Sequence, residues 1–155
     1  MDKNIKIDNK YLEEKISAFK NICYDNGMRI TPQRIAIYKE LITSQKHPSA
    51  IMIYDKVRSY FPNISLGTVN STLLTFAEIG LTKVLESSGD PKRFDPNLKA
   101  HHHFRCIKCG RIIDFYNEDF NSIEIPDELK ERFIVLDKKV HLEGICNKCR
   151  ANEKN

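Results

Sequence analysis

Two Cys-x-x-Cys pairs stand in the C-terminal half of the chain, Cys106 with Cys109 and Cys146 with Cys149. Two residues between cysteines allow a tight turn to direct both sulfurs at one ion, and two such turns supply the four thiolates of a tetrahedral zinc site. Such a closed site is structural, because no position is left for water or substrate. The spacing therefore predicts a zinc ion that clamps two ends of a small domain. Two disulfides, or iron on the same thiolates, are the alternatives.

Three consecutive histidines, His101, His102 and His103, directly precede the first cysteine pair. Alternate side chains of a strand share a face, so His101 and His103 should point one way. His102 should point the other way, and we expect it to be an exposed bystander. Asp95 lies just before this run, and Asp114 lies on the next expected strand, from which it could return to the same place. Nitrogen and carboxylate ligands suit Fe(II), Mn(II), Zn(II) or Ni(II), whereas a solvated surface segment is the alternative.

Composition sets the broad class of the protein. The chain has 155 residues, 41% of them apolar and 30% charged, which predicts a folded protein of one domain or two small ones. No stretch approaches the roughly 18 apolar residues of a membrane span, and the first residues lack the apolar region of a signal peptide. We therefore expect a cytoplasmic protein without a membrane partner, in which cysteines bind metals. The net charge of +4 permits nucleic-acid binding without requiring it.

Helical periodicity in the first half predicts four helices, at about residues 11–24, 32–43, 50–61 and 66–79. Thr31, Ser49 and Ser65 stand where N-caps are expected, and Gly27 and Gly80 where helices should end. A hairpin should follow, with strands at residues 81–87 and 92–95 and a turn at 88–91. Helices followed by a hairpin in this order predict a winged helix-turn-helix.

The second half has a different pattern. Short strands should flank the first cysteine turn at residues 103–106 and 111–116. A helix is expected at residues 126–133, and a long strand at residues 134–142 should lead into the second cysteine turn. The predicted fold class is α+β, with a winged-helix domain over residues 1–96, a hinge at 97–100 and a small α/β domain over 101–155.

Seven segments, spread from about Gly27 to Cys149, together resemble one family, the ferric uptake regulators, and more closely its peroxide-sensing branch. These segments are Arg29–Arg34, His47–Ala50 with Ile53-Tyr54, Pro62–Val69, Arg93–Asp95, His101–Gly110, Ile113–Phe115 and Gly144–Cys149. The resemblance implies a homodimeric repressor that binds a double-stranded DNA operator and dimerises through its second domain. It also implies that a regulatory metal holds the DNA-binding domains in the competent arrangement.

The resemblance also implies two metal sites and their ligands. Structural Zn²⁺ falls on the four cysteines, and regulatory Fe²⁺ or Mn²⁺ falls on five positions: His47, Asp95, His101, His103 and Asp114. The peroxide-sensing branch has Asp rather than Glu at the position of Asp114. In that branch Fe(II) reacts with hydrogen peroxide and oxidises a ligand histidine, whose equivalents here are His47 and His101. An additional site of some iron and zinc sensors is absent, because Ala100 and Lys138 occupy its positions.

The charge pattern of the first half favours DNA. Six basic residues and two acidic ones lie between residues 27 and 60, and the helix expected at 66–79 has only Glu78 as a charged group. Early positions of a recognition helix meet base edges, and basic groups elsewhere meet phosphates. Lys83, Lys92 and Arg93 on the wing could reach phosphates. The predicted DNA contacts are Arg29, Thr68, Asn70, Ser71 and Lys92.

Asn70 departs from the family, which usually has tyrosine at this position. Asparagine can bond adenine through two hydrogen bonds in the major groove, so the operator should differ from the family's usual one.

Three other functions stay open at this point. The first is an iron, zinc or manganese level sensor of the same family. The second is a non-haem metalloenzyme, since two histidines and a carboxylate with open positions resemble its metal-binding triad. The third is a zinc-ribbon interaction module with incidental histidines. Nothing in the sequence resembles a cosubstrate pocket, and we therefore expect no enzyme.

Overall fold

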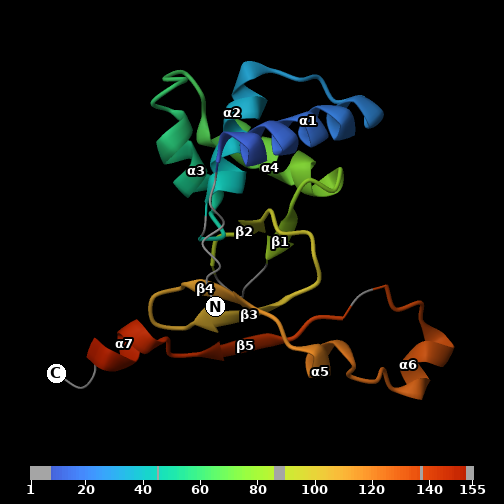
Figure 1. Ribbon diagram of the computed structural model, residues 1–155. Helices are drawn as coiled ribbons and strands as arrows, with labels where there is room; N and C mark the ends of the chain where they lie inside the picture. The colour runs from blue at the N-terminus through green and yellow to red at the C-terminus, as the bar shows by residue number, and fades with distance from the viewer. Residues whose placement is uncertain (1–7, 45, 86–89, 137, 153–155) are drawn as a thin grey trace. The chain divides into compact units, whose positions relative to one another are not determined.

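The computed structural model describes residues 8–44, 46–85, 90–136 and 138–152 (Figure 1). The chain divides into two compact units between Leu98 and Lys99. The N-terminal unit contains four helices and a two-stranded sheet. They are α1 (Asn9–Asp25), α2 (Pro32–Thr43), α3 (Ala50–Val57), α4 (Leu66–Glu78), β1 (Lys83–Leu85) and β2 (Arg93–Asp95).

The helices of this unit begin where the sequence predicts. Thr31 Oγ1 accepts a hydrogen bond from Arg34 N at 3.2 Å, and Ser65 Oγ accepts one from Thr68 N at 3.0 Å. Each bond satisfies a backbone N–H that the first turn leaves without a helical partner. Ser49 precedes α3 without such a bond, and α3 ends at Val57, four residues earlier than expected.

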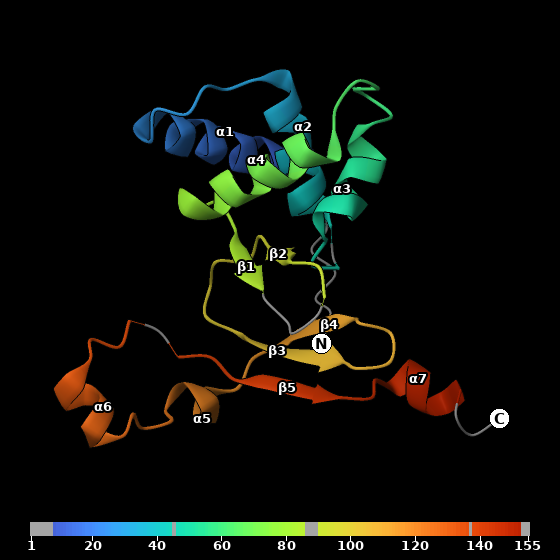
Figure 2. The ribbon, with the colours of Figure 1, turned by 180° about the vertical axis from the view of Figure 1, so that it is seen from behind.

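The core of the N-terminal unit lies between its four helices, which pack together in Figures 1 and 2. Phe19 stacks on Tyr38 at 4.6 Å between ring centroids, and Phe76 meets both rings edge-on. Cys23 is fully buried beside them, as a small residue of this core. Buried aromatic groups of this size dominate the stability of a small core.

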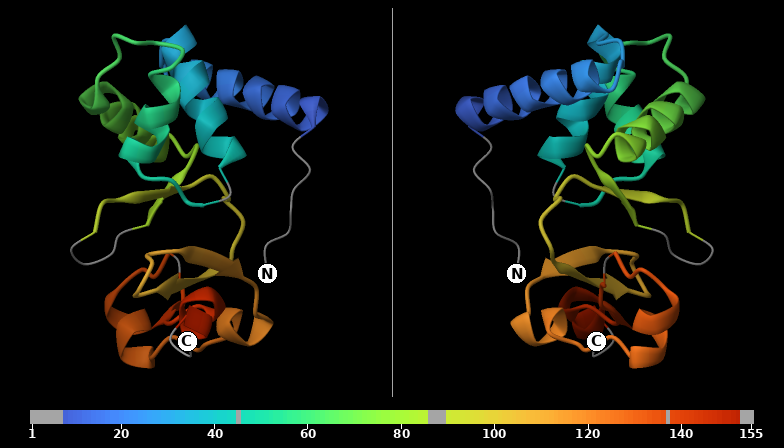
Figure 3. Two further views of the ribbon diagram at one scale, coloured as in Figure 1. Left: turned by 90° about the vertical axis from the view of Figure 1, so that its left-hand side faces the viewer. Right: turned by 90° about the vertical axis from the view of Figure 1, so that its right-hand side faces the viewer.

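The hairpin follows α4 and completes a winged helix-turn-helix, as predicted. Strands β1 and β2 are antiparallel, with Lys83 opposite Asp95, and run side by side in Figure 3. The expected end of the first strand and part of the turn fall on residues 86–89, outside the described residues. This order of elements, α2, α3, α4 and then the hairpin, supports a recognition helix at α4.

The C-terminal unit is built on a three-stranded sheet in the order β4-β3-β5. Its elements are β3 (His102–Cys106), β4 (Ile112–Phe115), α5 (Glu118–Asn121), α6 (Asp127–Arg132), β5 (His141–Gly144) and α7 (Asn147–Asn152). Strand β4 is antiparallel to β3, whereas β5 is parallel to it. Figures 1 and 2 show α5 and α6 at one end of this sheet and α7 after β5 at the other.

The predicted long strand at residues 134–142 is wrong. Only His141–Gly144 forms a strand, because only this stretch pairs with β3. Strands need a partner for their backbone groups, and apolar residues alone do not supply one. Ile134 and Leu136 are 89% and 91% exposed, so this apolar stretch lies on the surface of the described chain.

Apolar residues stabilise the two units very unequally. Among the described residues, Cys106, Ile112 and Cys146 are the only buried apolar residues of the C-terminal unit. So small a core requires a disulfide, a metal or a partner chain to be stable. None of the described helices is long and apolar enough to cross a membrane.

Candidate metal centres

The two cysteine pairs form one cluster at the end of the sheet. Strands β3 and β5 run parallel into their cysteine turns, and Ile107 N donates to Gly144 O at 2.9 Å between them. Cys106, Cys109, Cys146 and Cys149 then place their sulfurs within 4.8 Å of one another. The sequence prediction that two distant turns meet is thereby realised in the structure.

The first turn needs glycine. Gly110 has a φ of +67°, a left-handed conformation that residues with a side chain rarely adopt. Its N–H donates to Cys106 O at 2.8 Å, and Cys106 N donates to Arg111 O at 2.9 Å. Arg111 also donates to Asn147 Oδ1 at 3.0 Å, which ties the first turn to the second.

The spacing of the sulfurs fits zinc. Cys109 Sγ and Cys146 Sγ are 3.8 Å apart. Zn–S bonds of about 2.3 Å at tetrahedral angles would separate two sulfurs by about 3.8 Å. All four cysteines are free thiols in the structure, so the cluster is not a pair of disulfides.

Backbone groups favour the thiolate that a metal requires. Cys146 N donates to Cys106 Sγ at 3.3 Å, and this bond, with one from the backbone of Cys109, lowers the pKa of Cys106 to about 6. Hydrogen bonds that the Cys149 thiol donates to Cys109 and Cys146 raise its pKa to about 12. The four thiols therefore share protons, and a bound cation would displace them.

A second set of donors lies on one face of the same sheet. His103 is opposite Asp114 in the register of β3 and β4, and His101 lies two residues earlier. His101 Nε2 is 2.9 Å from His103 Nε2, and Asp114 Oδ1 is 3.5 Å from each nitrogen. These three predicted ligands are thus brought together within the C-terminal unit.

This triangle of donor atoms fits a divalent ion. The point that lies in the plane of the three atoms at equal distance from each is about 1.9 Å from them. Metal–nitrogen and metal–carboxylate bonds are about 2.0–2.1 Å long, so an ion close to this point could bond to all three. Two imidazoles and a carboxylate suit Zn(II), Fe(II), Mn(II) and Ni(II). Tyr116 contacts the same face, with its ring 5.9 Å from that of His101.

His102 points to the opposite face, as predicted, but it is not an exposed bystander. Its side chain is only 1% exposed, with its ring 5.5 Å from that of Phe115 and 5.6 Å from that of Phe120. Its Nδ1 accepts a hydrogen bond from Val140 N at 3.3 Å. The prediction failed because α5, which supplies Phe120, was not expected, although Asn117 is a good N-cap for it.

The sequence reading also missed His141, which begins β5. It is paired in register with His103, and their rings are 5.4 Å apart and tilted by 32°. Partial burial and the neighbouring His103 lower the pKa of His141. One signal in the sequence could have predicted this position. Two strands that lead into cysteine turns on one ion must lie side by side, which brings His141 next to His103.

The remaining predicted ligands, His47 and Asp95, belong to the N-terminal unit. His47 Nε2 lies 3.8 Å from Asp95 Oδ1. His47 has a φ of +45°, the one described non-glycine residue with a positive φ. Such a conformation costs of order 1–3 kcal/mol and persists only where neighbouring groups fix it.

Arg93 fixes the His47 loop. Its guanidinium donates to the carbonyl oxygens of His47 and, at 2.7 Å, of Lys46. Phe94 N donates to Pro48 O at 2.9 Å, so the strand that contains Asp95 is also bonded to this loop. Arg93 was expected to be able to reach DNA phosphates, but the structure uses its side chain within the unit, where burial lowers its pKa.

The predicted DNA contacts all lie at the surface. Val69, Thr72, Leu73 and Phe76 bury one face of α4, which leaves the other to solvent. The five predicted residues are exposed: Arg29, Thr68, Asn70, Ser71 and Lys92. Helix α4 therefore offers small polar side chains in its first two turns.

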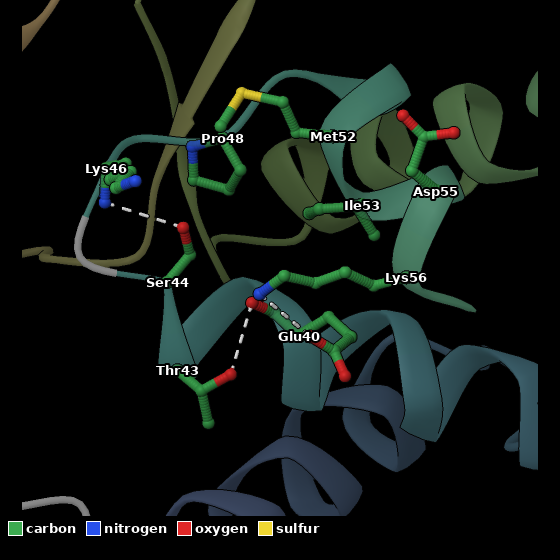
Figure 4. Close-up of a pocket in the computed structure, with 9 residues that line it drawn as sticks. All are labelled: Glu40, Thr43, Ser44, Lys46, Pro48, Met52, Ile53, Asp55 and Lys56. Carbon is green, nitrogen blue, oxygen red and sulfur yellow. Dashed lines mark hydrogen bonds and ion pairs between the residues drawn. The ribbon is translucent and has the colours of Figure 1, made fainter. Parts of the chain in front are cut away.

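A cavity of about 470 Å³ lies elsewhere in the N-terminal unit, between α2, α3 and the chain that joins them (Figure 4). Lys56 crosses it to pair with Glu40 at 3.2 Å. It is lined by none of the predicted site residues, although Lys46 and Pro48 flank His47. We assign no ligand to it.

Comparison with known proteins agrees with these features. The sequence model of the Ferric uptake regulator family matches residues 25–143. The peroxide-responsive repressor PerR of Staphylococcus epidermidis is 37% identical over 139 residues, which cover 90% of each chain. The Helicobacter pylori ferric uptake regulator Fur shares the fold, with a TM-score of 0.75 and 24% identity over 90% of this chain and 93% of that one.

A peroxide stress regulator of known structure, from Campylobacter jejuni, is 27% identical with a TM-score of 0.61, over 86% of this chain and 98% of that one. The chain belongs to the ferric uptake regulator family. The family consists of transcriptional regulators, so the metalloenzyme and the incidental zinc ribbon are set aside.

Proposed function

We propose that this protein is a metal-dependent transcriptional repressor that senses hydrogen peroxide. The observation that carries the proposal is the donor triangle of His101, His103 and Asp114, which matches a divalent ion in geometry and chemistry. The printed names of the relatives, a peroxide-responsive repressor and a peroxide stress regulator, support the same signal. An iron, zinc or manganese level sensor is the second candidate.

The regulatory site is completed by His47 and Asp95. Each unit contributes a preformed part. Two donors, His47 and Asp95, lie together in the N-terminal unit, where Arg93 bonds the backbone of the His47 loop, and three lie on the sheet of the C-terminal unit. A metal that bonds to both parts favours the arrangement of units in which both can reach it. Residues 97–100 act as the hinge between a DNA-binding domain (1–96) and a dimerisation domain (101–155).

The peroxide response follows from the choice of metal. Bound Fe(II) would supply the reaction with hydrogen peroxide that oxidises a ligand histidine, and Mn(II) would bind without it. His47 and His101 are the residues at risk. Their oxidation removes a nitrogen donor, which lowers the affinity for the metal and releases DNA.

The four cysteines hold the structural Zn²⁺. The C-terminal unit buries only three apolar residues among those described, so the free energy of zinc binding contributes directly to its folding. Backbone N–H groups aimed at Cys106 support this role, since hydrogen bonds to the ligands are typical of metal sites.

The protein binds its DNA operator as a homodimer in the cytoplasm. The C-terminal unit exposes a series of apolar side chains along β5 and the preceding chain: Phe133, Ile134, Val135, Leu136, Leu142 and Ile145. Strand β5 is also an edge of the sheet. A second copy that covers this surface would bury both the apolar groups and the free strand edge.

Metal-dependent DNA binding tests the proposal. Duplexes selected from a random library on the Mn(II)-loaded protein should be bound tightly with Mn(II) and weakly after the regulatory metal is removed. His101→Ala should abolish the difference while keeping zinc and thermal stability. Lys39→Ala, an exposed change in α2, is the control that should keep the metal effect. Regulation by this site would be refuted if the unsubstituted protein, like the His101→Ala protein, bound DNA with the same affinity with and without metal.

A further inference from the structure

A row of three potential ligands crosses the sheet of the C-terminal unit. His103 in β3 is paired in register with Asp114 in β4 on one side and with His141 in β5 on the other. Side chains of residues paired in this way project from the same face of a sheet. Asp114, His103 and His141 therefore share the face to which His101 also belongs, whereas His102 projects from the other.

His141 is close enough to join the donor triangle. Its ring centroid is 5.4 Å from that of His103, a separation similar to the 4.5 Å between His101 and His103. It lies on an edge strand and its side chain is exposed, so its imidazole can change rotamer without disturbing a core. His141 would then supply a fourth donor beside the three atoms of the triangle, the number that a tetrahedral site requires.

We propose that the C-terminal unit binds a divalent ion by itself, with His141 as a fourth ligand beside His101, His103 and Asp114. Three imidazoles and one carboxylate favour Zn(II), Co(II) or Ni(II) over Mn(II) and Mg(II), which prefer oxygen. The inference rests on the proposed function in one respect, since three of the four ligands also belong to the regulatory site.

The consequence is a competition between ligands. His101, His103, Asp114 and His141 would hold the ion within one unit, and His47 and Asp95 of the other unit would take the place of His141 in the complete regulatory site. His141 competes with these two ligands, so it strengthens capture of nitrogen-preferring metals and opposes the step that joins the units. Its replacement should therefore change which metals activate DNA binding.

The test uses Co(II) as the probe on the full-length protein with its structural zinc in place. In a His47→Ala/Asp95→Asn variant, Co(II) should still bind at one ion per chain, with the strong visible absorption of tetrahedral Co(II). Addition of His141→Ala should lower the Co(II) affinity by about 10-fold or more and weaken this absorption. Glu143→Ala, two residues along the same strand face, is the matched control and should leave both unchanged.

Each outcome decides between the two proposals. The inference is overturned if His141→Ala leaves the Co(II) affinity of the double variant unchanged. It is also overturned if the double variant binds no ion besides the structural zinc while the unsubstituted protein binds one. In both cases the regulatory site of the proposed function stands. If the unsubstituted protein binds no second ion, the proposed function fails as well. Circular dichroism and zinc content establish that each variant is folded.

Discussion

Arg93 shows how a residue expected at the DNA surface can instead serve a metal site. Its guanidinium donates hydrogen bonds to two backbone carbonyls of the loop that contains His47. Arg93 itself lies two residues before Asp95. A planar group with several fixed N–H donors suits this task better than lysine. The left-handed conformation of His47 therefore depends on a residue that coordinates nothing itself.

Replacement of Arg93 should weaken the regulatory site selectively. In Arg93→Lys the two carbonyls lose their fixed donors, so the His47 loop relaxes, and we expect the affinity for Mn(II) to fall by about 10-fold. Titration of Mn(II) against a competing chelator measures this change. Lys39→Ala should have no effect. An unchanged Mn(II) affinity in Arg93→Lys would show that the loop keeps its conformation without this side chain.

Removal of one zinc ligand should be far more damaging. Cys149→Ser leaves three thiolates for a site whose binding free energy is also folding free energy, so the C-terminal unit should lose both zinc and cooperative unfolding. Zinc content by atomic absorption and calorimetry of unfolding give the result. Cys23→Ser, which changes a buried cysteine of the other unit, should keep the zinc. A Cys149→Ser protein with full zinc content and an unchanged melting temperature would contradict the structural role.

At the scale of the elements, local signals predicted the four helices of the N-terminal unit and the two cysteine turns. Thr31, Ser65 and Gly110 act through bonds to near neighbours in the chain, so their effects can be read from sequence. Strand β5 could not be placed in this way, because its limits depend on parallel pairing with β3 about 40 residues earlier. The burial of His102 was missed for the same kind of reason, since Phe120 covers it from another element.

Helix α4 carries a prediction about DNA recognition. Asn70 is exposed on the free face of α4 beside Thr68 and Ser71, so its amide can pair with one adenine of the operator. Asn70→Ala should weaken binding to the selected operator by about 1–3 kcal/mol and relax the preference at one base pair. Binding to a panel of singly substituted duplexes measures both effects. Loss of affinity that is uniform over all duplexes would instead indicate a backbone contact.

At the scale of the whole molecule, stability and regulation both depend on groups outside the two hydrophobic cores. The N-terminal unit has a core of aromatic and aliphatic side chains, whereas the C-terminal unit buries only three apolar residues among those described and leaves a series of apolar side chains exposed. The sequence predicted that the chain has two parts and that the four cysteines meet, and the structure shows both. The exact domain limits and the roles of the ligands stay predictions. The sequence did not predict how little apolar area the second unit buries, which depends on the lengths of its strands.

Dimerisation should fail when the apolar surface of β5 is made polar. Leu142→Glu places a charge on the exposed edge strand, so the partner chain would have to desolvate it. Sedimentation should show twice the chain mass for the unsubstituted protein and the single chain mass for this variant. Lys130→Glu in α6, an exposed change away from β5, should remain dimeric. A Leu142→Glu protein that is still dimeric would place the interface elsewhere.

In the proposed function, a metal on His47, Asp95, His101, His103 and Asp114 senses hydrogen peroxide. The most direct measurement is peptide mass spectrometry of anaerobically prepared protein, loaded with Fe(II) and treated with a small excess of hydrogen peroxide. We predict one added oxygen on His47 or His101, and none in a matched Mn(II)-loaded sample. Unmodified histidines in the iron-loaded protein, with iron shown to be bound, would contradict peroxide sensing and leave a metal-level sensor of the same family.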